Sequence, residues 1–417
     1  PFRLLCRELG TSLCYTPMLH ARLLTSVRAY GALHFDPLEA DDTRDRPLFA
    51  QLAGHDPATV LAAGRQVQGR VDAVDLNFGC PQAIARKGRY GAFLLDEPET
   101  MVSLVSTLAA NLDVPVTAKL RLLPSVPDSI DLCLRLQEAG ASVLAVHGRT
   151  RAQNKQWAGA ADWDAIRDVV RATDIPIIAN GGIATSGDAT KCLAHTGAAA
   201  VMSSEALLEN PALFCANVDP VSGEYLDQTA LAYRYLRLCA DHPPLKGASI
   251  VRGHLFKMIH NGLRSHTDLR DELLLAGTLG DMEGVVGKLA DRGWEQPAFH
   301  TANVRPELSW YRRHRTAEEE SHATRGEGTS RGGGSPGAEA RREAAITTGV
   351  KLRLEGAAGG ESSNADVARA ALEKRAKKKA DRKRRNANRA AGGSRRQRKA
   401  QQRQDNLQGG AQEALLG

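Results

Sequence analysis

Short apolar runs alternate with helix-like segments along the first half of the chain. Between residues 12 and about 205, runs rich in β-branched and aromatic residues end in a polar residue or a glycine, and a segment rich in Leu and Ala follows each of them. The clearest runs occupy residues 48–54, 73–79, 115–121, 142–148, 175–181 and 198–204, and two further runs lie at 13–17 and near 33–35. This pattern predicts eight strands.

Continuous apolar strands that alternate with helices are typical of a parallel sheet covered on both faces. Eight such units in about 200 residues predict an α/β fold of the (β/α)8 TIM barrel type, which we place at residues 1–217. A doubly wound sheet is the alternative. It is disfavoured because no G-x-G-x-x-G turn follows the first predicted strand.

The chain changes character after the predicted barrel. Residues 225–240 and 251–263 have the spacing of amphipathic helices, and a third helical stretch covers 269–279 and beyond. Together they predict a small all-helical domain over residues 218–300. Residues 316–364 are rich in Gly, Ser, Glu and Ala, a composition that buries little apolar surface. We therefore expect a flexible linker over 301–364, followed by a disordered basic tail over 365–417.

The positive charge of the chain is local. The formal net charge is +7, but residues 369–403 hold 16 Lys and Arg against two acidic residues, so this segment alone contributes +14. The remainder of the chain has 39 basic and 46 acidic residues, a net charge of −7. A basic segment of this kind is typical of nucleic-acid contact or of a nuclear localisation signal, and the two interpretations are compatible.

The seven cysteines include no C-x-x-C pair, so they indicate neither a disulfide framework nor a zinc site, and we expect no metal. Mostly buried thiols suit a reducing compartment, either cytoplasmic or nuclear. No apolar run approaches the roughly 18 residues that a membrane span needs, and no secretory signal opens the chain. The first residue is Pro1 rather than Met, as expected of a fragment or a processed form.

Polar and catalytic residue types gather where the predicted strands end, which is where the active site of a (β/α)8 barrel lies. A polar residue at one strand end usually just begins a loop, but six strands share the feature. The residues are Pro17, Met18, Gln51, Asn77, Cys80, Lys119, Arg121, His147, Asn180, Gly181, Gly182, Ser203 and Ser204.

This set suits flavin mononucleotide (FMN). A lysine such as Lys119 would stabilise the negative charge that reduction places near the pyrimidine end of the flavin ring. Gln51 and Asn180 can pair with ring carbonyl and imide groups, and His147 can donate to the ring or to the phosphate. Two adjacent glycines after the seventh strand would expose backbone N–H groups, at a usual place for phosphate in this fold.

Five motifs together resemble the tRNA-dihydrouridine synthases, with the greatest likeness to the eukaryotic branch that acts on uridines 16 and 17. They are Asn77-Phe-Gly-Cys-Pro81, Ala118-Lys-Leu-Arg121, His147-Gly-Arg-Thr150, Ala161-Asp-Trp163 and Asn180-Gly-Gly-Ile183. The likeness covers residues 17–214, and more weakly 254–259. It implies an FMN-dependent oxidoreductase acting on a CH–CH group, reduced by NADPH or NADH, which converts uridine in tRNA to 5,6-dihydrouridine. We expect it to act as a monomer.

The resemblance also implies residue roles. Hydride passes from the flavin to C6 of the uracil, and Cys80 then gives a proton to C5; an ordinary thiol, with a pKa of about 8.5, carries that proton near neutrality. Substrate contacts are implied for Asn77, Lys119 and Arg121. Flavin contacts are implied for Pro17, Met18, Gln51, Lys119, His147, Asn180, Gly181, Gly182, Ser204 and Glu205.

The chain departs from the family at one of these positions. Many relatives have Gly-Arg where this chain has Ser204-Glu205, and that arginine would pair with the FMN phosphate. Because Glu205 would repel a phosphate, we expect its side chain to turn away. Backbone N–H groups near Ser203, Ser204 and Gly182 would then hold the phosphate.

Basic residues of the predicted helical domain and of the tail would bind the phosphates of tRNA. Two other functions remain open on the sequence. One is another FMN barrel acting on a free pyrimidine, similar to dihydroorotate dehydrogenase, in which the basic tail would have no purpose. The other is an RNA-binding barrel without catalysis, against which the intact set of Cys80, Lys119 and His147 argues.

Overall fold

The computed structural model describes residues 1–35, 43–154, 158–244, 247–297, 299 and 308–310. The chain divides into two compact units, residues 1–331 and 332–417, and every described residue belongs to the first. The predicted linker at 301–364 therefore lies outside the described residues, apart from Leu308–Trp310. The predicted basic tail at 365–417 lies wholly outside them.

Eight parallel strands form one sheet in the first unit. The strands pair in the order β1-β3-β4-β5-β6-β7-β8, and β2 also pairs with β3. This order follows the sequence, as in a (β/α)8 barrel, so the predicted fold class is confirmed. The strands are β1 (Cys14–Tyr15), β2 (Leu19–His20), β3 (Leu48–Ala53), β4 (Ala73–Phe78), β5 (Val116–Leu122), β6 (Val143–Thr150), β7 (Ile177–Asn180) and β8 (Ala200–Met202).

The strand predicted near residues 33–35 is wrong. Leu33 lies in a helix, α3 (Arg28–His34), which follows α2 (Ala21–Ser26). The buried residues of this region recur at helical spacing, and Phe35 is only 2% exposed. The second strand is instead β2, which comes directly after the loop that begins at Pro17. With two residues, β2 is too short to leave an apolar run in the sequence.

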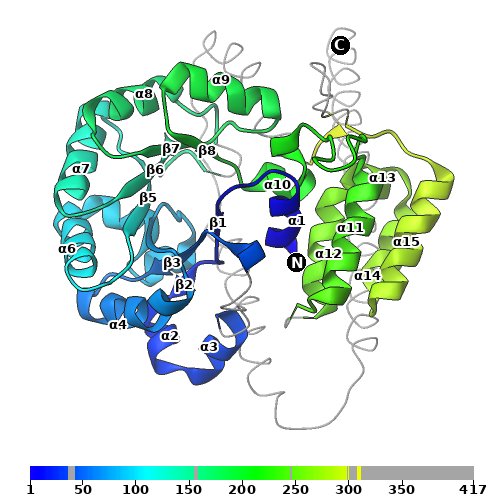
Figure 1. Ribbon diagram of the computed structural model, residues 1–417, viewed down its shortest axis with the longest axis horizontal. Helices are drawn as coiled ribbons and strands as arrows, with labels where there is room; N and C mark the ends of the chain where they lie inside the picture. The colour runs from blue at the N-terminus through cyan, green and yellow to red at the C-terminus, as the bar shows by residue number, and fades with distance from the viewer. Residues whose placement is uncertain (36–42, 155–157, 245–246, 298, 300–307, 311–417) are drawn as a thin grey trace, which may run out of the picture. The chain divides into compact units, whose positions relative to one another are not determined.

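Helices form the outer layer over the strands (Figure 1). Four of them begin at a side chain that accepts a backbone N–H three residues later, the usual N-cap bond: Asp56, Ser125, Asp162 and Thr185. The five long helices of this layer are α4 (Pro57–Val67), α6 (Pro98–Ala109), α7 (Val126–Glu138), α8 (Trp163–Ala172) and α9 (Ser186–Thr196).

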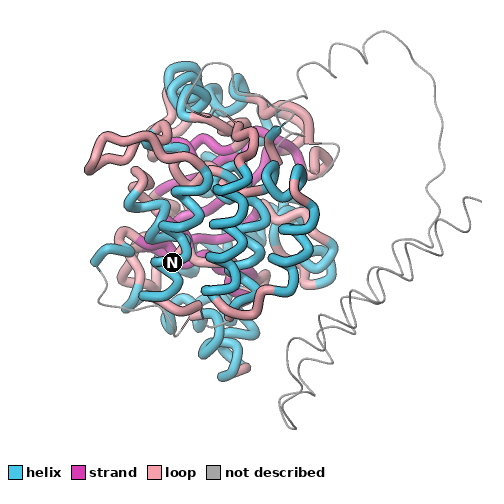
Figure 2. Tube along the Cα trace, turned by 90° about the vertical axis from the view of Figure 1, so that its right-hand side faces the viewer, coloured by secondary structure: helices cyan, strands magenta, loops and turns pink. Residues whose placement is uncertain are grey.

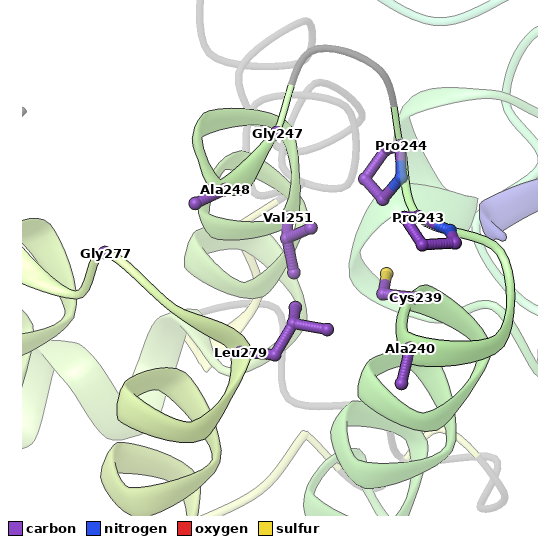
Figure 3. A pocket seen from close by; sticks show the side chains of 9 residues that line it. All are labelled: Cys239, Ala240, Pro243, Pro244, Gly247, Ala248, Val251, Gly277 and Leu279. Atoms are coloured by element: carbon purple, nitrogen blue, oxygen red, sulfur yellow. The ribbon is translucent and has the colours of Figure 1, made fainter.

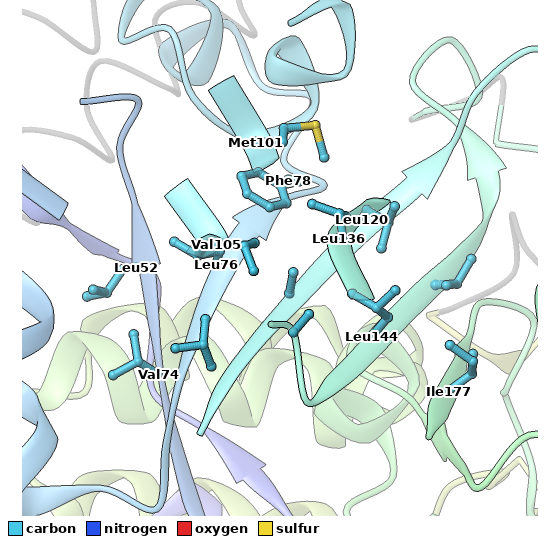
Figure 4. Packing of buried hydrophobic residues seen from close by; sticks show 14 of the residues in the cluster. Leu52, Val74, Leu76, Phe78, Met101, Val105, Leu120, Leu136, Leu144 and Ile177 are labelled. Atoms are coloured by element: carbon cyan, nitrogen blue, oxygen red, sulfur yellow. The ribbon is translucent and has the colours of Figure 1, made fainter. Parts of the chain in front are cut away.

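The main hydrophobic core lies between these helices and the outer face of the sheet. Figure 4 shows Val74, Leu76 and Phe78 of β4 in this core, together with Met101 and Val105 of α6. Successive side chains of a strand point to opposite faces. The residues between those three on β4 therefore point to the inside of the barrel, where the polar groups gather.

A second core lies in the helical region. Helices α11 and α15 contact each other, as do α14 and α15, and Figure 2 shows the helices of this region side by side. Helix α1 (Phe2–Glu8) joins this core through Leu4 and Leu5, although residues 1–217 were predicted to form the barrel. The other helices are α11 (Gln228–Asp241), α12 (Ala248–Met258), α13 (His260–Ser265), α14 (Thr267–Leu275) and α15 (Leu279–Arg292).

The helix predicted over 225–240 is present as α11, but the next two differ from their predicted bounds. The predicted helix 251–263 is divided at Ile259 into α12 and α13, because Ile259 has φ −104° and ψ 32°. The third, predicted over 269–279 and beyond, is divided: α14 ends at Leu275, and α15 begins after the cap residue Thr278. None of the described helices is long and apolar enough to cross a membrane.

A short helix after the last strand, α10 (Glu205–Glu209), contacts α12 and so joins the strand layer to the helical region. Its last residue, Glu209, is buried. The Glu209 carboxylate accepts hydrogen bonds from the Ser309 hydroxyl at 2.6 Å and from the Trp310 backbone N–H at 2.7 Å. These residues were predicted to belong to a flexible linker, but they dock on α10.

Candidate active site

Strand register brings the predicted site residues together on the inner face of the barrel. Residues paired across parallel strands lie side by side, and alternation keeps every second residue on one face. The register pairs join these residues into three layers: Gln51–Asp75–Thr117, then Asn77–Lys119, then Arg121–His147–Asn180. The strand-end residues that the sequence singled out on β3 to β7 therefore surround one space.

The loop that carries Cys80 is held from both sides. The side-chain oxygen of Asn77 accepts the backbone N–H groups of Gly79, at 3.1 Å, and of Cys80, at 3.0 Å. The carbonyl oxygen of Cys80 accepts the Ala92 N–H at 3.0 Å. Gly91 has φ +68°, and a Cβ at that position would lie 2.6 Å from the Cys80 oxygen. The chain needs a glycine there, a requirement that no local sequence signal revealed.

The side chain of Cys80 is half-buried. It packs with Met18, a predicted flavin contact, against a small cluster of Ala53, Ala85 and Tyr90. Pro17, the other predicted contact in this loop, is exposed. The thiol therefore lies at an apolar edge of the space that the strand ends surround.

Lys119 lies beside the Cys80 loop. Its ammonium nitrogen is 3.8 Å from the position that a Cβ on Gly79 would take. Burial, followed by the charge of Arg121, lowers the pKa of Lys119 to about 8, while Asp75 and Cys80 act in the opposite direction. A cation held in this way gains stability when a negative charge develops next to it.

Arg121 is buried and clamps two loops. Its Nε donates to the Gly79 carbonyl at 2.9 Å, and its Nη1 donates to the carbonyls of Thr150, at 2.9 Å, and Gln153, at 3.0 Å. Burial, followed by the charge of Arg149, lowers the pKa of Arg121 to about 10. The other terminal nitrogen of Arg121, Nη2, makes no bond to these carbonyls. The predicted contact between Arg121 and the substrate would therefore use Nη2.

His147 and the two glycines after β7 form another edge of the site. The His147 Nε2 lies 3.0 Å from the Arg149 guanidinium, which can only donate, so this ring nitrogen accepts. Gly181 and Gly182 have φ values of +104° and +79°. A Cβ on Gly181 would lie 2.8 Å from the His147 ring. The glycine allows the loop to pass close to the imidazole.

Trp163 holds this loop, because its indole N–H donates to the Gly181 carbonyl at 3.0 Å. This fixes the peptide groups around the two glycines. The tryptophan belongs to the Ala161-Asp-Trp163 motif, and no separate role was predicted for it. The adjoining Asp162 caps helix α8.

Two predicted flavin contacts already have protein partners. The Gln51 amide donates to Asp75 at 2.8 Å and accepts from the Asn77 amide at 2.7 Å. The Asn180 amide donates to the Met202 carbonyl at 2.9 Å. Each of the two donating nitrogens keeps a second N–H that can reach a ligand.

The Ser204-Glu205 position lies at the start of α10. Ser204 is exposed and makes no capping bond with its side chain. The charge of Glu205 acts on Lys257 of α12, where it opposes the burial that lowers the lysine pKa. Lys257 in turn lies over the Trp310 ring, 5.6 Å from its centroid. Glu205 thus has a cation in the helical region as a neighbour.

A pocket of about 200 Å³ in the helical region is not this site (Figure 3). Its lining is apolar apart from the thiol of Cys239, and it shares no residue with the strand-end set. Its lining residues are Cys239, Ala240, Pro243, Pro244, Gly247, Ala248, Val251, Gly277 and Leu279.

The chain is similar to several known proteins. Its residues 1–273 match the family model described as dihydrouridine synthase (Dus). It is 40% identical to a rat protein named tRNA-dihydrouridine(16/17) synthase [NAD(P)(+)]-like, over 73% of this chain and 67% of the rat protein. It is 37% identical to the Schizosaccharomyces pombe tRNA-dihydrouridine(16/17) synthase [NAD(P)(+)], over 68% of this chain and 72% of that protein.

A mouse protein with the same name as the rat one is 39% identical over 62% of its own length, so the chain spans about two thirds of these relatives. A crystal structure of mandelate oxidase is similar at a TM-score of 0.33 and 19% identity, covering 49% of this chain and 59% of that one. That likeness is too low to add to the argument. The family match covers well over half of the sequence, and the chain belongs to the dihydrouridine synthase family.

Proposed function

We propose that this protein reduces uridine in tRNA to 5,6-dihydrouridine, at positions 16 and 17, with electrons from NADPH or NADH. One observation carries the proposal. Cys80, Lys119 and Arg121 meet at neighbouring strand ends in a chain of the dihydrouridine synthase family. A thiol that can donate a proton, beside cations that stabilise developing negative charge, suits the reduction of a pyrimidine double bond by a hydride donor.

The donor set around this space fits FMN. Lys119 and the second amide N–H groups of Gln51 and Asn180 suit the pyrimidine end of the ring. His147 and the glycine loop, in which a Cβ on Gly181 would lie 2.8 Å from the His147 ring, suit the phosphate side. Met18 adds an apolar contact, and Pro17 lies exposed in the same loop. When bound, FMN supplies the hydride that C6 of the uracil accepts.

The residues of the chain supply the rest of the reaction. Cys80 holds a proton on its Sγ and gives it to C5 of the uracil, where negative charge is left after C6 is reduced. The Lys119 ammonium stabilises that charge, and the Arg121 guanidinium holds the carbonyl edge of the base through its Nη2. Asn77 keeps Cys80 in place through two hydrogen bonds to the loop.

The substrate must leave the tRNA stack to reach the strand ends, which costs a few kcal/mol. We propose that basic residues of the helical region and of residues 365–417 compensate by binding tRNA phosphates. All the groups named belong to one chain, and we propose a monomer as the active form. Its place of action would be the cytoplasm or the nucleus.

The test replaces Cys80 by alanine in the purified protein with FMN bound. We expect dihydrouridine formation in tRNA to be largely lost while FMN content and NADPH oxidation are retained, because only the proton donor is removed. Cys215→Ala is the matched control, since Cys215 is also half-buried and lies outside the strand-end set. Full turnover by Cys80→Ala would refute the proton-donor role.

A further inference from the structure

Three side chains below the Cys80 loop form a continuous line of hydrogen bonds. The Gln51 Nε2 donates to the Asp75 Oδ2 at 2.8 Å, and the Asn77 Nδ2 donates to the Gln51 Oε1 at 2.7 Å. The Asn77 Oδ1 then accepts the N–H groups of Gly79 and Cys80. The line runs from a carboxylate on β4, through an amide on β3, back to β4 and into the loop.

The direction of this line matters, because each amide group has a donor end and an acceptor end of nearly the same shape. Gln51 and Asn77 could each be turned by 180° without changing the packing. Turned in that way, Asn77 would present N–H donors to the N–H groups of Gly79 and Cys80, and both loop bonds would be lost. The two backbone N–H groups favour one direction at the loop end, and the whole line keeps that direction only if the group at its other end favours it too.

We propose that Asp75 is a positioning residue that sets this direction and thereby holds Cys80 for proton transfer. An ionised carboxylate can only accept hydrogen bonds, so Gln51 must turn its NH2 group toward it. The Gln51 oxygen then faces Asn77, and the Asn77 oxygen faces the loop. The catalytic part of this inference rests on the proposed function, whereas the hydrogen-bond part does not.

The surroundings of Asp75 keep it an acceptor near neutral pH. Its side chain is fully buried, which raises its pKa to about 6, while bonds from Thr117 and Gln51 and the Lys119 charge act in the opposite direction. Tyr15 also faces it from β1, and the Asp75 charge contributes to raising the tyrosine pKa. The Thr117 hydroxyl donates to the other carboxylate oxygen, Oδ1, at 2.7 Å.

The first test replaces Asp75 by asparagine in the protein with FMN bound. The new amide can either accept from Gln51 or donate to it, so the line is no longer held to one direction. We expect hydrogen exchange at the Gly79 and Cys80 amides to become about tenfold faster, as for the loss of one hydrogen bond, and dihydrouridine formation to fall at least as much. FMN content serves as the measure of folding at the site.

Thr117→Val is the matched control. It removes the other hydrogen bond to the same buried carboxylate with nearly unchanged volume. Because that bond also lowers the Asp75 pKa, the two variants are compared at about pH 8, where the carboxylate stays ionised and the line keeps its direction. We expect exchange at the two amides and turnover to stay within about threefold of the wild type. Equal effects from Asp75→Asn and Thr117→Val would mean that Asp75 only supports packing, and would overturn the proposal.

The double variant Asp75→Asn/Gln51→Glu provides a rescue. A carboxylate at position 51 accepts from both neighbouring amides, so the Asn77 oxygen again faces the loop. We expect amide protection at Cys80 to return. Turnover is not used as the readout of this variant, because Gln51→Glu also removes the N–H assigned to FMN. Absence of renewed protection would refute the direction argument. The exchange experiment needs no tRNA, so its result is independent of whether the proposed reaction occurs.

Discussion

Replacing Gly91 by alanine tests how closely the fold constrains Cys80. Gly91 has φ +68°, a conformation that costs an L-residue about 1–2 kcal/mol. The new Cβ would also lie 2.6 Å from the Cys80 carbonyl oxygen and 3.0 Å from the Cys80 Cβ. Both contacts are with backbone or near-backbone atoms, so the Cys80 loop itself must move. Overpacking of this kind adds about 1–3 kcal/mol.

We therefore expect Gly91→Ala to lower the free energy of unfolding by about 2–5 kcal/mol in total. Two other glycines separate the contributions. Gly223 has φ +75° but no atom within 4 Å of its hypothetical Cβ, so Gly223→Ala carries the conformational cost alone, about 1–2 kcal/mol. Gly69 has neither feature, and Gly69→Ala should stay within about 1 kcal/mol of the wild type.

Urea unfolding followed by circular dichroism measures these differences. Dihydrouridine formation is then measured without urea, at a temperature at which all three variants remain folded. Because only Gly91 touches Cys80, turnover should fall in Gly91→Ala and stay unchanged in the other two. If Gly91→Ala and Gly223→Ala were equal in both stability and turnover, the close approach of residue 91 to Cys80 would affect neither folding nor catalysis.

Two further results are expected. Burial lowers the Lys119 pKa to about 8, so its ammonium is present below that pH and lost above it. The rate of base reduction should therefore fall as pH rises through about 8. A rate that stays constant up to pH 10 would contradict the role of this cation. Deletion of residues 365–417 should weaken tRNA binding and make it less dependent on salt in filter-binding titrations, and an unchanged salt slope would exclude the tail from binding.

The sequence predicted the strand-end residues well because two simple periodicities determine them. Parallel strands end at one edge of a barrel, and alternate residues face its interior. Asn77, Lys119 and His147 lie on the interior face of the barrel, as these periodicities predict. The strand near residue 33 was predicted wrongly because the run there is short, and a short apolar run does not distinguish a strand from a helix face.

The supporting residues were not predictable, because they act through register and not through local pattern. Asp75 is one of several polar residues in an apolar strand, and only the pairing of β3 with β4 shows that Gln51 lies beside it. Gly91 lies eleven residues after Cys80, and only the fold brings the two into contact. The sequence gives residue types at strand ends, whereas the three-dimensional contacts give the direction of hydrogen bonds.

Glu205 shows how a departure from a family pattern can be balanced elsewhere in the fold. A carboxylate at the start of α10 would disfavour a nearby phosphate, but its charge acts on Lys257, which α12 brings to it. Lys257 is in turn covered by Trp310, and the Trp310 backbone is held by the buried Glu209 at the other end of α10. One short helix thus carries two carboxylates, and each has a partner outside the barrel. Because the Glu205 charge acts on Lys257 of the helical region, we predict that the retention of FMN at the proposed site depends on the docking of that region as well as on the barrel itself.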